Sequence, residues 1–452
     1  MPPKPADTGE QGPLRKVLTT RLLYFFILGD VLGAGVYVLV GEIAAKSGGA
    51  VWVPLTVALL LALLTAASYA ELATKYPRAG GASYYATRAY GPAVGFFTGY
   101  CMLAAGIVSV AALARGFAGD YLTALVSLPV VIVAVVFLVL LALLNARGIR
   151  ESTRFNTVAT LIETGGLLLV VGLGAWIVMR GDGDVGRLTQ LGTDSASPAA
   201  AVMAGAVLAY YSFVGFETSV NVAEETLDPT RSYPRALFGA LATAGVVYAA
   251  VGAAASAAVP TSTLAASDGP LLEVVRTAGA VPPKLFALIA LVAVANGALL
   301  TGIMSSRLAY GMAREGLLPA FLTRVLPTRR TPWAAIAATS TAAALLAATG
   351  EIDVLAGTLV LLLLAVFLTV NTAVLVLRRD RRSPTTGHFR APAAVPVLGA
   401  LSCLALATRI EASVWARGLA LMGVGVVLGV LTLWLRRRRA VPADTKPAAD
   451  NP

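Results

Sequence analysis

Residues 29–41 read GDVLGAGVYVLVG, inside an apolar run that extends from about residue 22 to residue 45. The triplet Gly33-Ala34-Gly35 interrupts that run, because glycine adopts unusual dihedral angles and lets other backbone approach closely. A second interruption, SFVGF at residues 212–216, lies inside the apolar run from about 199 to 222. Lipid cannot satisfy backbone groups that lose their helical partners, so each interruption must be buried in protein or line a cavity.

The composition places both runs in a membrane-embedded chain. Hydrophobic residues make up 57% of the sequence, mean hydropathy is +0.78 and only 13% of residues are charged, about half the charged fraction of soluble domains. About 20 apolar residues cross the hydrocarbon as a helix. We therefore predict an all-α membrane protein with twelve transmembrane helices, near residues 20–45, 50–73, 92–118, 126–145, 157–179, 199–223, 235–259, 283–310, 332–350, 353–377, 392–410 and 414–435.

The positive charge is distributed as in a membrane protein and not as in a nucleic-acid-binding protein. The net charge is +11, and with the N-terminus in the cytoplasm 27 of the 35 Lys and Arg residues fall on the inner side. The positive-inside rule requires this asymmetry. We predict a multi-pass protein of the cell (plasma) membrane with both termini cytoplasmic and no nucleic-acid partner. The basic clusters at the inner edge are predicted to contact lipid headgroups of the bilayer.

The chain divides into one membrane domain and two tails. Residues 1–18 and 437–452 are predicted to be disordered cytoplasmic tails. The two interruptions lie 179 positions apart, counted from Ala34 to Phe213, which is about half of a ten-helix core at 19–378. Five helices per half is an odd number, so the second half must enter the membrane inverted. This pattern is the 5+5 inverted repeat of the LeuT fold, with helices 1 and 6 discontinuous and helices 11 and 12 appended at 379–436.

Four motifs, in the right order and on the right spans, carry a family resemblance. They are residues 29–41, FVGFE at 213–217 followed by DPTRSYP at 228–234, SRLAYGMAREGLLP at 306–319, and YAEL at 69–72 leading to PRAGG at 77–81. From about residue 15 to 380 the chain resembles the amino acid–polyamine–organocation (APC) superfamily of permeases. The resemblance implies a secondary transporter of amino acids or related amines that works by alternating access. It implies proton-coupled uptake or substrate exchange, with neither ATP nor a bound cofactor.

A zwitterionic amino acid suits the two interruptions without any charged side chain. The N-terminal end of a half-helix offers free N–H groups and the positive end of the helix dipole to a carboxylate, and here those donors belong to Gly33, Ala34 and Gly35. Close helix packing explains this triplet when it is taken alone, but the matching second interruption favours binding. For the ammonium group, the resemblance implies carbonyl acceptors at and beside the breaks, from Val31, Tyr211, Ser212 and Val214, next to Gly215.

Side chains around the interruptions are predicted to shape the site. Tyr211 resembles the aromatic residue that closes over the substrate in this family, although an interior packing tyrosine is the alternative. The side-chain pocket is predicted to include Cys101, Met102, Gly106 and Asn296, for which packing is an equally good explanation.

Three carboxylates, Asp30, Glu163 and Glu217, fall within membrane depth, where charged groups are costly and are functional hypotheses by default. Some proton-coupled members of the family that this chain resembles carry a lysine at the position of Glu163. The carboxylate here could take up and release a proton, make a static hydrogen bond, or bind sodium, and these readings stay open. Glu217 is predicted to fix the second half-helix by hydrogen bonding, and Asp30 to cap a helix or face the cytoplasmic vestibule.

Further charges are expected at the cytoplasmic ends of the helices. Glu71, Glu224 and Glu225 are predicted to form inner-gate ion pairs with four arginines, Arg78, Arg231, Arg307 and Arg314. A solvated surface pair of little energetic value is the alternative.

Other function classes have weaker support in the sequence. An enzyme would need converging His, Cys, Asp or Ser groups, but the single histidine, His388, lies in a basic loop and no metal-ligating cluster is visible. A channel expects a continuous polar lining, which these spans lack. An amino acid exchanger or a non-transporting sensor would keep the same pocket, so both remain alternatives to proton-coupled uptake.

Overall fold

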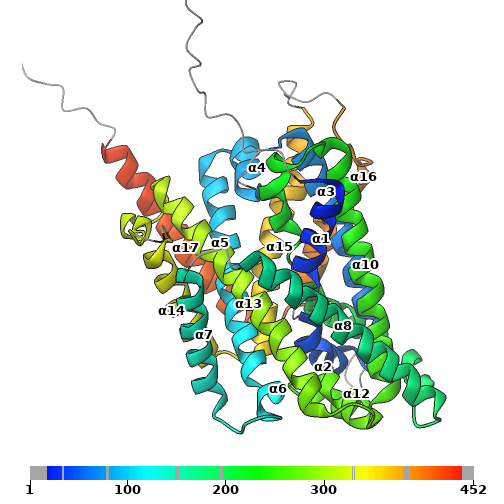
Figure 1. Cartoon of the computed structure of the whole chain (residues 1–452). Coiled ribbons are helices and arrows are strands. Elements are labelled where there is room, and N and C mark those ends of the chain that lie inside the picture. Colours follow the sequence, from blue (N-terminus) through cyan, green and yellow to red (C-terminus); the bar gives the residue numbers. More distant parts are fainter. Residues whose placement is uncertain are drawn as a thin grey trace, which may run out of the picture.

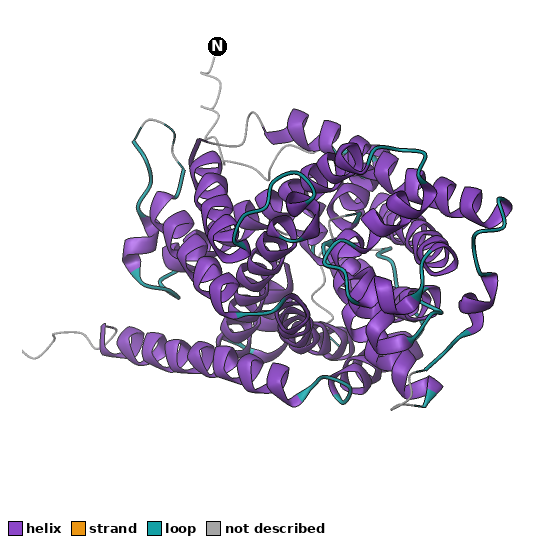
Figure 2. Cartoon of the chain, turned by 90° about the horizontal axis from the view of Figure 1, so that it is seen from below, coloured by secondary structure: helices purple, strands orange, loops and turns teal. Residues whose placement is uncertain are grey.

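The computed structural model describes residues 18–439 except 33–34, 78–80, 148–151, 193–196, 328, 330 and 380–386; the side chains of 152–157, 222, 224–225 and 433–439 are also outside the description. Over the described residues the chain folds into helices and loops without a strand (Figure 2). A single isolated bridge joins Leu18 to Thr226 there. The prediction of an all-helical chain is confirmed.

Within the described residues eight helices are long and apolar enough to cross a membrane, and a bent pair of helices counted as one span makes nine. They are α3 (Trp52–Lys75), α5 (Pro92–Ala118), α7 (Val130–Arg147), α8 (Ser152–Met179), α10 (Pro229–Ala258), α13 (Pro283–Arg314), α15 (Ile352–Leu377) and α17 (Ala412–Arg439). The bent pair is α1 (Thr20–Val31) and α2 (Gly35–Ser47), whose axes differ by 47°. Three shorter apolar helices are α9 (Pro198–Ser212), α14 (Trp333–Thr349) and α16 (Ala394–Ala407).

Short elements connect the long helices. They are α4 (Gly81–Tyr90), α6 (Asp120–Thr123), η2 (Val185–Thr189), η3 (Phe216–Glu225), α11 (Thr261–Ala265), α12 (Pro270–Ala278) and η4 (Ala320–Thr323). Helix starts follow ordinary capping chemistry: proline occupies the first turn of α5, α9, α10, α12 and α13, where its missing N–H costs nothing.

The first interruption lies where the sequence predicts it. Helix α1 ends at Val31, and the Leu32 N–H donates to the Leu28 carbonyl at 2.7 Å to close the last turn. Helix α2 begins at Gly35. In Figure 1, α1 lies above α2. Gly33 and Ala34, which the sequence analysis places at the centre of the break, lie outside the described residues.

The second interruption also lies at the predicted position. Helix α9 ends at Ser212, and Gly215 adopts φ +126° and ψ −35°, a conformation that residues with a side chain rarely adopt. The chain then continues as the 3₁₀ helix η3 and not as an α-helix. Three aromatic rings pack together at the start of η3. The ring centroid of Phe216 lies 5.5 Å from that of Phe367, in a stacked arrangement, and 5.8 Å from that of Tyr69, edge to face.

The packing brings the two interrupted segments together. Helix α1 packs on α10, and α2 packs on α9. On the other side of the molecule α5 packs on α13 and α15. The two breaks therefore face a wall made by α5, α13 and α15.

One buried ion pair differs from the inner-gate pairing that the sequence suggests. Glu71, 1% exposed, accepts two hydrogen bonds from Arg378, at 2.7 and 2.6 Å. The same carboxylate accepts from the Ala391 N–H at 3.0 Å, and Arg378 donates to the Ala391 carbonyl at 2.7 Å. The hydrogen bonds that Arg378 donates to Glu71 hold the pKa of Arg378 above its ordinary value. The pair therefore holds the segment before α16 against α3 and the end of α15. Of the other residues in the predicted inner gate, Arg78 and the side chains of Glu224 and Glu225 lie outside the description.

Candidate functional site

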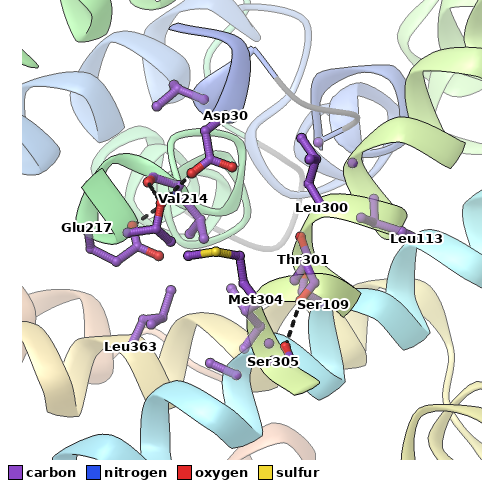
Figure 3. A pocket seen from close by; sticks show the side chains of 18 of the residues that line it. Asp30, Ser109, Leu113, Val214, Glu217, Leu300, Thr301, Met304, Ser305 and Leu363 are labelled. Atoms are coloured by element: carbon purple, nitrogen blue, oxygen red, sulfur yellow. Dashed lines mark hydrogen bonds between the residues drawn. The ribbon is translucent and has the colours of Figure 1, made fainter. Parts of the chain in front are cut away.

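A cavity of about 360 Å³ lies where the two interrupted segments face α5, α13 and α15. In Figure 3, Asp30, Val214 and Glu217 lie on one side of this space, and Leu113, Leu300 and Thr301 lie on the other. The volume is within the range of about 300–1,000 Å³ that small-molecule sites occupy. We call the α1, α2, α9 and η3 side the break side, and the α5, α13 and α15 side the opposite wall.

The two interruptions are in direct backbone contact at the cavity. A Cβ atom on Gly35 would lie 2.9 Å from the Ser212 Cα, and one on Gly215 would lie 2.8 Å from the Asp30 carbonyl oxygen. Both distances are shorter than real side chains tolerate, and the obstructing atoms belong to the backbone. Glycine at both positions is therefore what allows the first and second breaks to meet.

Two carboxylates accept hydrogen bonds at the breaks, and one of these bonds joins the two segments. Glu217, 4% exposed, accepts a hydrogen bond on Oε2 from the Gly215 N–H at 2.9 Å. Asp30 accepts a hydrogen bond on Oδ2 from the Thr218 hydroxyl. The first bond satisfies a donor that the break releases, and the second joins the end of α1 to η3.

Several carbonyls that the sequence analysis assigns to the substrate already accept one hydrogen bond. The Tyr248 hydroxyl donates to the Val31 carbonyl at 2.5 Å, and the Val214 N–H donates to the Tyr211 carbonyl at 3.0 Å. A carbonyl oxygen has two lone pairs, so each can accept a second bond. Val31, Gly35, Tyr211, Ser212, Val214 and Gly215 all line the cavity.

The Tyr211 side chain lines the cavity and reaches the opposite wall. It is 7% exposed, and its hydroxyl shares a hydrogen bond with the Ser109 hydroxyl of α5 at 3.2 Å. This bond links the break side to the opposite wall. The Ser212 hydroxyl nearby is buried and has no hydrogen-bond partner among the described residues.

Glu163 lines the cavity from α8, behind the first break. It is 1% exposed, and its Oε1 atom has no hydrogen-bond partner in the described part of the chain. Its backbone carbonyl accepts from the Tyr37 hydroxyl at 2.6 Å. One turn earlier on α8, the Thr160 hydroxyl would lie 3.2 Å from a Cβ on Gly29, so α8 is pressed against α1 at this level.

The predicted side-chain pocket is found in part. Met102, Gly106 and Asn296 line the cavity, whereas Cys101 is buried and is not among the lining residues. Sequence reasoning missed Ser109 on α5 and, on α13, Leu300, Thr301, Met304, Ser305 and Arg307. Helical periodicity from Asn296 places 300 and 304 on its face. The prediction stopped at Asn296 and was not extended along this face.

No cluster of three or more His, Cys, Asp or Glu side chains that could hold a metal ion occurs within the described ranges. The polar groups of the cavity are backbone amides and carbonyls, a few hydroxyls, the side-chain amides of Asn221 and Asn296, one arginine and three carboxylates. Such a set suits reversible binding of a small polar molecule.

Comparison with known proteins extends over the whole membrane domain. The sequence model of the amino acid permease family matches residues 18–428. A branched-chain amino acid permease of Bacillus subtilis is 26% identical over 448 residues, covering 94% of each chain. A methylthioribose transporter of the same organism is 25% identical, over 94% of this chain and 96% of its own. The chloroplastic cationic amino acid transporter 9 of Arabidopsis thaliana is 29% identical, over 73% of this chain and 61% of its own.

Proposed function

Because this chain belongs to the amino acid permease family, we propose that it carries an amino acid across the cell membrane by alternating access, holding it between the two helix breaks. Membership makes the chain a multi-pass membrane transporter and not an enzyme. The observation that carries the proposal is the backbone contact of the two breaks at a cavity of about 360 Å³. The relatives are named for amino acids and for methylthioribose, so the substrate must be argued from this chain's own residues.

We propose that the helices make twelve spans. The eight long apolar helices and the bent α1–α2 pair account for nine. Helices α14 and α16 and the α9–η3 segment, residues 198–225, complete the number. In the proposed arrangement the first ten spans would form the LeuT-type 5+5 inverted repeat, and the positive-inside rule, applied to the Lys and Arg distribution, supports cytoplasmic termini.

In the proposed complex the substrate carboxylate lies at the start of α2. The N–H groups of Gly35 and of its two predecessors, Gly33 and Ala34, would donate to it, aided by the positive end of the α2 dipole. The ammonium group would donate to carbonyls of the α1 and α9 ends, those of Val31, Tyr211, Ser212 and Val214. Tyr211 would act as a gate, because opening its hydrogen bond to Ser109 separates the break side from the opposite wall.

Glu163 is the proposed proton-coupling group. Its Oε1 atom faces no partner among the described side chains, and its own carbonyl is tied to Tyr37 on α2. A proton on this carboxylate would remove a charge from behind the first break, where the substrate carboxylate is proposed to lie. We expect an inward proton gradient to accelerate uptake, and Glu163→Gln to abolish that response while the protein still binds substrate. A mutant that keeps the full response would show that another group couples transport to protons.

Uptake into proteoliposomes tests the whole proposal. Purified protein is reconstituted, radiolabelled amino acids and polyamines are offered outside, and a pH gradient or internal unlabelled substrate is supplied. Uptake driven by the pH gradient supports proton symport, and uptake that requires internal substrate identifies an exchanger. Tight binding without flux would identify a sensor and overturn the transport proposal.

A further inference from the structure

The opposite wall of the cavity presents several large apolar side chains, beside a few polar ones from α5 and α13. Leu300, Met304, Leu359 and Leu363 supply large apolar surfaces. Of the small polar residues there, Ser305 donates to the Thr301 carbonyl at 2.8 Å, and Ser109 is paired with Tyr211 at 3.2 Å. A polar substrate side chain placed against these four apolar side chains would exchange water for hydrocarbon there, which is costly.

The charges that line the cavity are segregated between its two sides. The three carboxylates lie on the break side or behind it: Asp30 on α1, Glu217 on η3 and Glu163 on α8. Asp30 and Glu217 already accept hydrogen bonds from Thr218 and from the Gly215 N–H. The opposite wall carries one charged lining residue, Arg307 of α13, whose guanidinium makes no ion pair or hydrogen bond within the residues described. A cationic substrate side chain would therefore meet a like charge on this wall.

Met304 bounds the space available to a substrate side chain. In Figure 3 its thioether extends from α13 into the middle of the cavity, between the wall at Leu300 and the break side at Val214 and Glu217. Its side chain is 36% exposed although it lies within a long packed helix. An unbranched thioether fills irregular space and changes rotamer readily, so it can adjust to apolar side chains of different length.

We propose that the substrate is a neutral amino acid with an apolar side chain of medium length, seated against Met304, and that Arg307 excludes cationic side chains. This inference rests on the proposed function, since it assumes that the breaks hold the amino and carboxylate groups. It goes further by assigning the side-chain specificity to the opposite wall. Hydrophobic contact selects by size only weakly, whereas an unpaired charge is rejected strongly.

The first test measures stabilisation of the purified full chain by each of the twenty amino acids. A ligand that binds the folded state raises its stability by mass action. We expect Val, Leu, Ile and Met to bind most tightly, with a gain of about fourfold for each buried CH₂ group beyond Ala. Lys and Arg should bind on the order of a hundredfold more weakly than Leu. If Lys, Arg, Asp or Glu binds most tightly, the inference is overturned while the proposed function stands. If none of the twenty binds, both are overturned.

The second test changes Met304 and compares it with a distant methionine. In Met304→Ala the space grows, so we expect the affinity for Phe relative to Val to rise about tenfold. Met179→Ala is the matched control, because Met179 is 76% exposed at the end of α8, away from the cavity. If folded Met304→Ala protein has the same affinity for Phe relative to Val as Met179→Ala, Met304 is not the specificity residue.

The third test removes the positive charge. In Arg307→Gln the ratio of the affinity for Leu to the affinity for Lys should fall by about tenfold, which corresponds to roughly 1.4 kcal/mol. Arg314→Gln, on the same helix but outside the cavity lining, is the control and should leave the ratio unchanged. Binding is measured instead of transport, because a change in the transport cycle would then not be mistaken for a change in specificity. An unchanged ratio in Arg307→Gln would remove Arg307 from the proposal.

Discussion

The contact between the two helix breaks can be tested at Gly215. Substitution by alanine there has two costs. The φ of +126° disfavours any side chain, by about 1–3 kcal/mol. The added Cβ would also lie 2.8 Å from the Asp30 carbonyl oxygen and 3.0 Å from its carbon. Because those atoms belong to the backbone of α1, the contact can be relieved only by moving the breaks apart.

The expected result is a loss of binding and not only of stability. Moving the breaks apart strains the Asp30–Thr218 hydrogen bond, which joins α1 to η3, and a bond to a charged group contributes about 1.5–3 kcal/mol. A loss of about 1.4–2.8 kcal/mol in binding free energy would lower the affinity tenfold to a hundredfold. The measurement is the affinity, from thermal stabilisation, for the amino acid that stabilises the unmodified chain most, followed by uptake into proteoliposomes.

Three other glycines separate the two costs. Gly181→Ala introduces a side chain at φ +84° with no atom within 4 Å, so it has the strain without the contact. Gly35→Ala has the contact, 2.9 Å to the Ser212 Cα, without a positive φ, and Gly172→Ala has neither. We expect Gly35→Ala and Gly215→Ala to lose affinity, and Gly181→Ala and Gly172→Ala to keep it. If Gly215→Ala binds as well as Gly181→Ala, the reasoning that joins the two breaks into one site is refuted.

Two further predictions concern groups around the site. Tyr248→Phe removes the donor to the Val31 carbonyl and should lower the free energy of unfolding by about 0.5–1.5 kcal/mol; chemical denaturation measures this, and an unchanged midpoint would contradict the bond. Arg378→Gln leaves Glu71, 1% exposed, without its cation and should cost about 3–5 kcal/mol. In the double mutant with Glu71→Gln much of that loss should be recovered, and a purely additive double mutant would argue against the pair.

Sequence reasoning predicted the parts of the site that depend on local backbone chemistry. Apolar runs long enough to cross a bilayer define the helices, and the breaks at Gly33-Ala34-Gly35 and residues 212–216 interrupt them. These features follow from the chain alone, because lipid imposes one rule on every buried peptide group. For the same reason the bends at Val31 and Ser212 lie where they were predicted. The number of spans remains a prediction where α14 and α16 are short.

The partners of each side chain were decided only by the tertiary structure. Among the described residues Glu71 pairs with Arg378, 307 positions away, and not with Arg231, Arg307 or Arg314. Met304 was missed as a lining residue, and Arg307 was predicted only as an inner-gate charge, because the side of α13 that meets the cavity depends on how its neighbours pack. Sequence determines where a membrane helix must break, since that is a property of consecutive peptide groups. Which side chains surround the break depends on how distant helices pack, and hydropathy carries no information about that.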